Sequence, residues 1–202
     1  MDASALRFVL ASASPRRQDL LLRIGLEPEV RPAEVDERPR PGEGPSAYVL
    51  RLAEEKVRTA ARPGELVLAA DTTVAIGGEL LGKPASDAEA AAMLRRLSGR
   101  EHDVATGVAL LRSDDERLAS EVSETTVRMR RLTGAWIAWY VASGEPRDKA
   151  GAYAIQGLGA LFVDRVDGNY TNVVGLPLPA VRRLFEQLGH DVLDYRAANR
   201  RT

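Results

Sequence analysis

The chain has 202 residues, of which 45% are hydrophobic and 28% charged, a composition typical of a globular protein that buries a sizeable core. Its formal net charge of −1 argues against a general nucleic-acid-binding protein, and no apolar run approaches the roughly 20 residues that span a bilayer. The lack of cysteine excludes disulfides, thiolate metal sites and thiol nucleophiles. Together with an N-terminus that lacks a signal-peptide pattern, it is compatible with a cytoplasmic protein.

The first third of the chain predicts a strand, a helix, a loop and a second helix. Ser14 is a good helix N-cap, Pro15 suits the first helical position and Gly25 suits the helix end. The segment at 31–45 is rich in proline, glycine and charge, which predicts a loop. The expected elements are a strand at 7–11, a helix up to 25 and a second helix, capped by Ser46, that runs to 62.

The remainder predicts paired strands with fewer helices. The apolar strand at 66–76 is interrupted by the polar residues 71–73, and Gly77-Gly78 predicts a hairpin turn. Further expected strands are 103–112, 119–130, 161–166 and 170–174, with helices at 86–98, 133–143 and 179–188 and a glycine-rich loop at 145–159. This order indicates a mixed-sheet α/β protein.

The segment Ser12-Ala13-Ser14-Pro15-Arg16-Arg17 predicts a phosphate site. The N-terminus of a helix presents unpaired N–H groups and a positive dipole, and hydroxyls and guanidiniums there add donors for phosphate oxygens. The structural alternative is an ordinary N-cap with solvated arginines. Basic residues in a first turn oppose the helix dipole, which favours the phosphate interpretation.

Lysine is rare in this chain, because only Lys56, Lys83 and Lys149 occur among 28 basic residues. On a helical wheel, Lys56 falls in the middle of the apolar face of the helix at 46–62. A buried ammonium is costly unless it is paired, so we expect Lys56 to face a carboxylate or a ligand. The alternative is a side chain that extends to the rim of the apolar face.

Asp71 directly follows a run of buried strand residues, and Lys83 lies on the returning arm of the same hairpin. Ligands gather at the ends of strands in open α/β sheets, and a carboxylate there can deprotonate a water beside a phosphate-bound metal. The alternative is a buried Asp–Lys pair. In the glycine-rich loop, Gln156 offers both a donor and an acceptor for recognition of a base. Asp36 lies in an acidic loop cluster for which a solvated face is the default interpretation, and together with Asp71 it could supply carboxylate ligands for Mg²⁺.

These segments resemble the Maf family of nucleotide pyrophosphatases, also called septum-formation-inhibitor-like proteins. The matching segments occur in family order and cover nearly the whole chain. They are LASASPRR (10–17), AADTTV (69–74), GELLGKP (78–84), LRRLSGR (94–100), DKAGAYAIQG (148–157) and VVGLPL (173–178). Ala154 stands where a glycine is common in the family, and Asp36 stands where some relatives have glutamate.

The resemblance implies a Maf/ITPase-like α/β fold: an elongated mixed sheet flanked by helices, with two lobes around a central cleft and no separable linker within 1–202. It implies hydrolysis of a nucleoside triphosphate to the monophosphate and pyrophosphate with a divalent cation, Mg²⁺ or Mn²⁺. In this resemblance Asp71 is the proton acceptor. Asp36, Lys56 and Lys83 match family positions for metal and phosphates. Combined with the argument from the helix N-terminus, this leads us to expect phosphate binding by Ser14, Arg17, Lys56 and Lys83 and metal binding by Asp36 and Asp71.

Three positions separate the subgroups of this family, and here they read Arg16, Thr72 and Gln156. They resemble the subgroup that acts on dTTP and UTP. The subgroup that favours 7-methyl-GTP has a tryptophan after the aspartate and a glutamate in place of the glutamine. A pyrophosphatase for 7-methyl-GTP or another non-standard nucleotide, and a nucleotide-binding regulator of cell division that does not hydrolyse, are the alternatives. The expected partner is the nucleotide, without nucleic acid or membrane, and a homodimer is left open.

Overall fold

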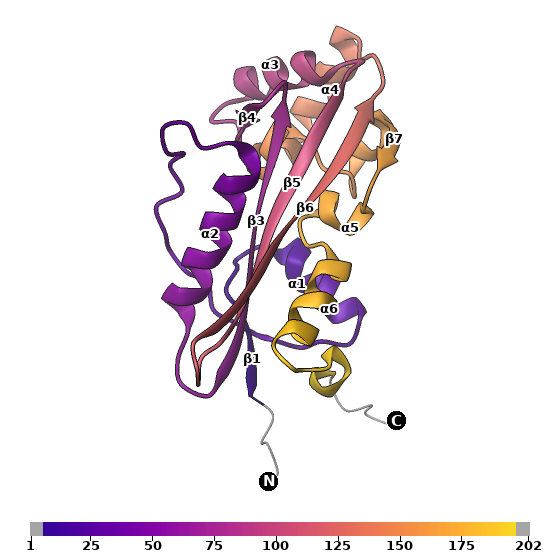
Figure 1. Ribbon diagram of the computed structural model, residues 1–202. Coiled ribbons are helices and arrows are strands. Elements are labelled where there is room, and N and C mark those ends of the chain that lie inside the picture. Colours follow the sequence, from indigo (N-terminus) through magenta and orange to yellow (C-terminus); the bar gives the residue numbers. More distant parts are fainter. Residues whose placement is uncertain (1–5, 197–202) are drawn as a thin grey trace, which may run out of the picture.

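The computed structural model describes residues 6–196, and its centre is one twisted, mixed seven-stranded sheet (Figure 1). The strands are β1 (Arg7–Leu10), β2 (Glu29–Val30), β3 (Glu65–Ile76), β4 (Glu79–Leu81), β5 (Glu101–Arg112), β6 (Arg117–Met129) and β7 (Val163–Asp167). Their order is β2-β1-β3-β5-β6-β7, and β4 pairs with the far end of β3. β1 runs parallel to β2 and β3, and all the other pairs are antiparallel. The predicted mixed-sheet α/β fold is confirmed.

Helices cover both faces of the sheet. They are α1 (Pro15–Arg23), α2 (Pro45–Ala60), α3 (Asp87–Leu97), α4 (Gly134–Ala142), α5 (Tyr170–Val174) and α6 (Leu178–Gln187), with short 3₁₀ segments η1 (Glu145–Asp148), η2 (Ala150–Ala152), η3 (Leu158–Phe162) and η4 (Val192–Tyr195). Helix α2 lies alone on one face, whereas α1 and α6 cover the other (Figure 1). Among the described residues, no helix combines the length and apolar character needed to cross a bilayer.

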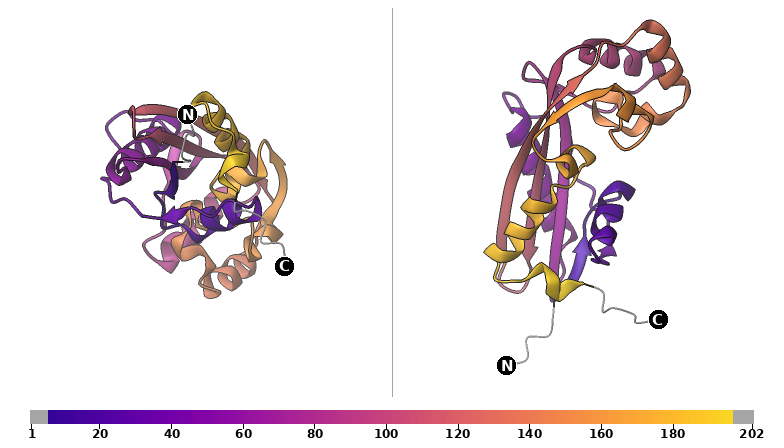
Figure 2. Two further views of the ribbon diagram at one scale, coloured as in Figure 1. Left: turned by 90° about the horizontal axis from the view of Figure 1, so that it is seen from below. Right: turned by 90° about the vertical axis from the view of Figure 1, so that its right-hand side faces the viewer.

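Alternation along β3 assigns its residues to two separate cores. Val67 and Ala69 pack under α2, whereas Leu66, Leu68 and Ala70 pack under α1 and α6. A third core lies at the other end of the sheet, where α3, α4 and the 3₁₀ segments η1, η2 and η3 form an upper lobe. This lobe leans over α1 in the right-hand view of Figure 2.

Two local expectations were wrong. Residues 170–174 form helix α5 and not a strand, because the Asn169 side chain caps the helix by accepting a hydrogen bond from the Asn172 N–H at 2.8 Å. This capping outweighs the β-branched residues of the segment. Helix α2 begins at Pro45 with Gly44 as its N-cap, and the Ser46 hydroxyl instead donates to Glu124.

Candidate active site

The site lies where one edge of β3 has no neighbouring strand. β1 pairs with β3 only from Glu65 to Leu68, and β4 pairs with it only from Val74 onwards. Within the described part of the chain, residues 69–73 therefore have a strand neighbour on one side only, which is β5. Consecutive residues point to opposite faces of a sheet, yet both faces are accessible at an open edge. Asp71 and Thr72 accordingly line one cavity of about 360 Å³.

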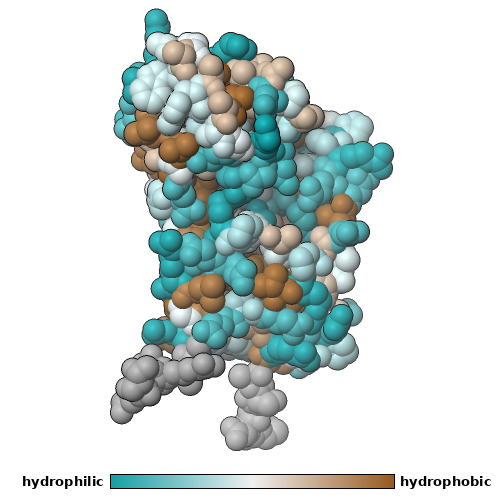
Figure 3. Space-filling view, turned by 180° about the vertical axis from the view of Figure 1, so that it is seen from behind, coloured by the Kyte–Doolittle hydropathy of each residue, from teal (hydrophilic) through white to brown (hydrophobic). Residues whose placement is uncertain are grey.

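The cavity lies between the upper lobe and α1. Seen from behind, hydrophilic side chains cross the middle of the molecule between its upper and lower parts (Figure 3). The charged groups that line the cavity are five cations and three carboxylates, which are Arg16, Arg17, Lys56, Lys83, Lys149, Glu37, Asp71 and Asp148. An excess of cations with interspersed carboxylates suits a polyanionic ligand.

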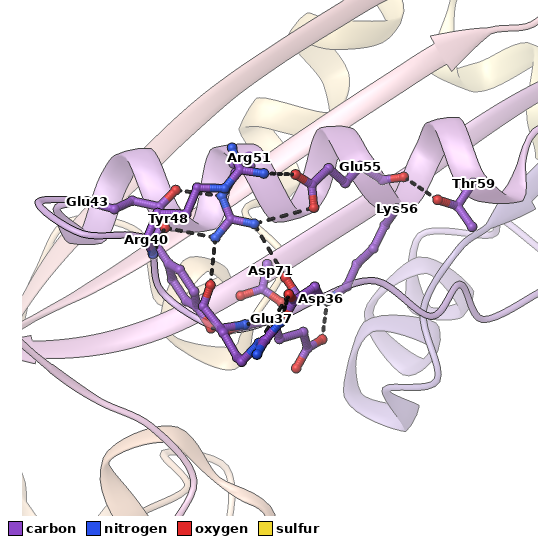
Figure 4. A network of polar contacts seen from close by, with 11 residues as sticks. Asp36, Glu37, Arg40, Glu43, Tyr48, Arg51, Glu55, Lys56, Thr59 and Asp71 are labelled. Atoms are coloured by element: carbon purple, nitrogen blue, oxygen red, sulfur yellow. Dashed lines mark hydrogen bonds and ion pairs between the residues drawn. The ribbon is translucent and has the colours of Figure 1, made fainter.

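On the α2 face, Lys56 lies between two carboxylates. Its ammonium donates to Asp71 Oδ1 at 2.6 Å and to Glu37 Oε1 at 2.7 Å (Figure 4). The side chains of Lys56 and Asp71 are only 9% and 13% exposed, so the pair is shielded from water. The expected carboxylate-facing Lys56 is confirmed.

The charge of Lys56 also sets the state of its second partner. Burial acts to raise the pKa of Glu37, but the hydrogen bond and charge of Lys56, together with the charges of Lys83 and Arg17, outweigh it, and the pKa lies below its ordinary value. Glu37 is therefore ionised at neutral pH, and two carboxylates share one ammonium at the cavity wall.

A glycine on β5 brings α2 close enough for this contact. Gly107 pairs directly with Asp71 in the sheet. A Cβ atom at Gly107 would lie 2.3 Å from the carbonyl oxygen of Val49 in α2, which is far inside van der Waals contact. The helix that carries Lys56 thus rests directly on the backbone beside Asp71.

Asp36 does not lie in the cavity. Its carboxylate forms an ion pair with Arg38 at 2.6 Å and remains 59% exposed. The hydrogen bonds from Arg38 are the main reason that the pKa of Asp36 is far below its ordinary value. The neighbouring Glu37 is the acidic residue of this loop that reaches the cavity, so the geometry does not support Asp36 as the partner of Asp71. The acidic cluster was visible in the sequence, but which of its members turns inward was not.

On the other face, Arg17 is held at three nitrogens. Its Nε donates to the Gly175 carbonyl at 2.8 Å, Nη1 to Ser12 Oγ at 3.0 Å and Nη2 to Thr72 Oγ1 at 3.1 Å. Burial lowers the pKa of Arg17, although Asp71 acts in the opposite direction. A guanidinium remains protonated in proteins, so Arg17 presents a fixed positive charge to the cavity.

The first turn of α1 adds Ser14 and Arg16 to the same cavity. The Ser14 side chain makes no capping hydrogen bond, which leaves its hydroxyl for a ligand. Arg16 lies 3.4 Å from Asp148 across the cavity mouth, and Asp148 also accepts a hydrogen bond from Lys149. The rarity of lysine does not by itself locate Lys149, which the structure places on the cavity wall.

The upper lobe contributes Lys83, from the segment after β4, and Gln156 from the glycine-rich loop. Glu145 holds this loop by accepting from the backbone N–H groups of Leu158 and Gly159 at 2.9 and 3.1 Å. The hydroxyl of Tyr140 donates to the same carboxylate at 2.8 Å. The loop is therefore anchored on both sides of the position of Gln156, because Tyr140 also accepts from the N–H of Ala154.

The structure gathers nearly all of the predicted site residues into one cavity. Those that line it are Ser14, Arg16, Arg17, Lys56, Asp71, Thr72, Lys83 and Gln156. Their positions agree with the expectation, whereas their individual roles stay predictions. In the part of the chain that the structure describes, no group of three or more acidic or histidine side chains forms a preformed metal cage.

Sequence comparisons identify one family and several similar relatives. The sequence profile described as "Maf-like protein" matches residues 7–188. A protein of Myxococcus xanthus (strain DK1622) named dTTP/UTP pyrophosphatase is 53% identical over 191 residues, covering 94% of this chain and 96% of the relative. One of the same name from Anaeromyxobacter dehalogenans (strain 2CP-C) is 55% identical, covering 91% and 94%. A solved Staphylococcus aureus Ham1 protein covers 60% of this chain and 71% of its own, with 15% identity and a TM-score of 0.42.

Proposed function

The chain belongs to the Maf family of proteins, and we propose that it hydrolyses dTTP and UTP to the nucleoside monophosphate and pyrophosphate. The names of its relatives support this substrate pair. The observation that carries the proposal is the shielded carboxylate of Asp71, which faces the same cavity as the first turn of α1 and its arginines.

The cationic groups account for binding of the triphosphate. Arg17 is fixed and charged, and Arg16, Lys83 and Lys149 lie around the same cavity. The N–H groups of the first turn of α1 favour an anion at the same place. Bound in this way, the phosphates lie along the wall that also carries Asp71, which makes attack on the phosphorus nearest the nucleoside feasible.

Asp71 acts as the general base. Its Oδ1 is held by Lys56, and the carboxylate takes a proton from a water molecule as the water oxygen bonds to the α-phosphorus. The bond between the α-phosphorus and the bridging oxygen breaks, and pyrophosphate leaves with the electron pair. Lys56 and Arg17 stabilise the negative charge that develops on the phosphate oxygens.

A divalent cation fits this site only together with the substrate. Mg²⁺ usually takes one or two carboxylates and completes its shell with phosphate oxygens and water, and Asp71 and Glu37 are two carboxylates on one cavity wall. These two residues would hold Mg²⁺ or Mn²⁺, which would neutralise phosphate charge and orient the α-phosphate. Asp36, paired with Arg38 outside the cavity, does not fit this role.

A substrate panel tests the proposal. The protein is incubated with Mg²⁺ or Mn²⁺ and dTTP, UTP, CTP, ITP or 7-methyl-GTP, and both pyrophosphate and orthophosphate are measured. We expect pyrophosphate with the highest kcat/KM for dTTP and UTP. A preference for 7-methyl-GTP would assign the protein to the subgroup that favours this nucleotide. Nucleotide binding without pyrophosphate release would establish a regulator, and orthophosphate release would refute cleavage at the α-phosphorus.

A further inference from the structure

A chain of hydrogen bonds runs from Arg17 into the core of the sheet. Arg17 Nη2 donates to Thr72 Oγ1 at 3.1 Å, and Thr72 Oγ1 lies 2.9 Å from Thr106 Oγ1. Thr106 in turn donates to the backbone carbonyl of Asn172 at 3.3 Å. Thr106 and Asn172 are fully buried, and neither lines the cavity.

Two directions of donation are compatible with this series of hydrogen bonds. A guanidinium only donates, so the oxygen of Thr72 accepts from Arg17. A backbone carbonyl only accepts, so Thr106 either donates to Asn172 and accepts from Thr72, or donates to Thr72, which then donates to another acceptor. The other acceptor within reach of Thr72 is the Gly175 carbonyl, at a longer 3.4 Å. In both arrangements the hydroxyl proton of Thr72 is donated to an acceptor of the protein itself.

The fold fixes the positions of the residues in this series of hydrogen bonds. Thr72 and Thr106 are directly paired in the β3–β5 ladder, so their side chains lie side by side on the face that α1 and α5 cover. Asn172 lies on α5, where its side-chain amide donates to the Val104 carbonyl and to Thr125 Oγ1, both at 2.9 Å. The far end of the chain is thus fixed to two strands. The near end is the cation that faces the cavity.

We propose that Thr106, with the Asn172 carbonyl, is a positioning residue that fixes the Arg17 guanidinium through Thr72. This inference rests on the proposed function, because it assigns Arg17 to the triphosphate. Thr72 then affects the substrate through the orientation of Arg17 and not by donating its own hydroxyl proton. Orienting a charged donor in advance lowers the reorganisation needed when the phosphates bind and react.

The first test removes only the hydroxyl of Thr106. Thr106→Val is nearly isosteric, and we expect kcat/KM for dTTP and UTP to fall about tenfold, the factor associated with one buried hydrogen bond. The ratio of the kcat/KM values for different nucleotides should not change, because Arg17 is assigned to the triphosphate, which all of them share. Thr106→Ser restores the hydroxyl and should recover most of the activity. The matched control is Thr126→Val on β6, whose hydroxyl bonds only Asp103 at 2.8 Å, and it should match wild type.

The decisive test is a double-mutant cycle with Arg17→Ala. If Thr106 acts through Arg17, then Thr106→Val should change kcat/KM by less than twofold once Arg17 is absent. Where Arg17→Ala is too slow to assay, the same cycle uses the Kd of a UTP analogue with a methylene bridge between the α- and β-phosphates. Losses that multiply across the two variants would overturn the proposal, as would full activity of Thr106→Val.

Two further measurements distinguish failure of this proposal from failure of folding and from failure of the proposed function. Should Thr106→Val fail to fold, Thr72→Val breaks the same chain one step nearer the cavity and enters the same cycle. A change in the dTTP-to-CTP ratio for Thr72→Val, persisting in the Arg17→Ala background, would show direct contact with the base and contradict the proposal. The proposed function fails separately, by absence of pyrophosphate release from the wild-type protein.

Discussion

Replacing Asp71 with asparagine isolates its role as the base. Asparagine keeps the size of the side chain and an oxygen that can accept from Lys56 at the 2.6 Å position, but it removes the charge that takes up a proton. General-base catalysis contributes about 10²–10⁴-fold, so kcat should fall by this factor, or about 3–5 kcal/mol in the activation barrier.

The same change should affect stability much less. Lys56 remains paired with Glu37 at 2.7 Å, so no buried cation is left alone. A charge-assisted hydrogen bond at a site that is 13% exposed becomes a weaker one, which we expect to cost about 1–2 kcal/mol. For a chain of this length, this corresponds to a fall in Tm of about 2–8 °C. Such a fall is too small to explain the loss of activity.

Three measurements check this reasoning: pyrophosphate release from dTTP, Tm by calorimetry, and the Kd of the methylene-bridged UTP analogue. We expect a large loss of kcat with a modest change in Tm and a measurable Kd. Turnover within tenfold of wild type would refute Asp71 as the base. Loss of folding at the assay temperature would show instead that Asp71 is needed for structure.

Three further predictions follow from the geometry. Glu37→Gln should lower kcat/KM at least tenfold and weaken its dependence on Mg²⁺, whereas Asp36→Asn should leave both within twofold of wild type; equal effects would contradict the placement of the two acids. Gly107→Ala should destabilise by about 1–3 kcal/mol and reduce activity by displacing α2, while Gly134→Ala, with open space around it, should do neither. Burial lowers the pKa of His102 to about 4. As pH falls, the unfolded chain is therefore protonated at this histidine before the folded protein is, and about 3 kcal/mol of folding stability should be lost between pH 6.5 and 4. His102→Gln should flatten this part of the pH–stability curve measured by denaturant unfolding, and an unchanged slope would refute the assignment.

Much of the site was predictable because its residues are charged at positions where the surrounding pattern calls for apolar side chains. Lys56 is a cation on an apolar helix face, and Asp71 is a carboxylate within a buried strand. Both exceptions carry a large desolvation cost, so a partner or a ligand was the physical expectation. The order of elements also predicted most of the fold. The exceptions are helix α5, which was expected as a strand, and the short strand β2, which was not expected.

What the sequence could not provide was the direction of side chains in irregular segments. Asp36 and Glu37 are adjacent in a loop without periodicity, and only tertiary contact with Lys56 distinguishes them. The close approach of α2 at Gly107 likewise depends on a helix that is distant in sequence. The buried Thr106 follows a pattern of alternation that any strand would share, so its link to Arg17 was invisible without coordinates.

The open edge of β3 has a consequence for how such a protein can change over time. Neighbouring positions 71 and 72 belong to different faces, and each is supported by its own set of helices and its own core. A substitution beneath α1 or α5 can therefore displace Arg17 and its hydrogen-bonded wall while the opposite wall, with its carboxylates and lysine, keeps its packing. In such an arrangement the grip on the phosphates and the carboxylate that acts on water can change separately as a lineage diverges.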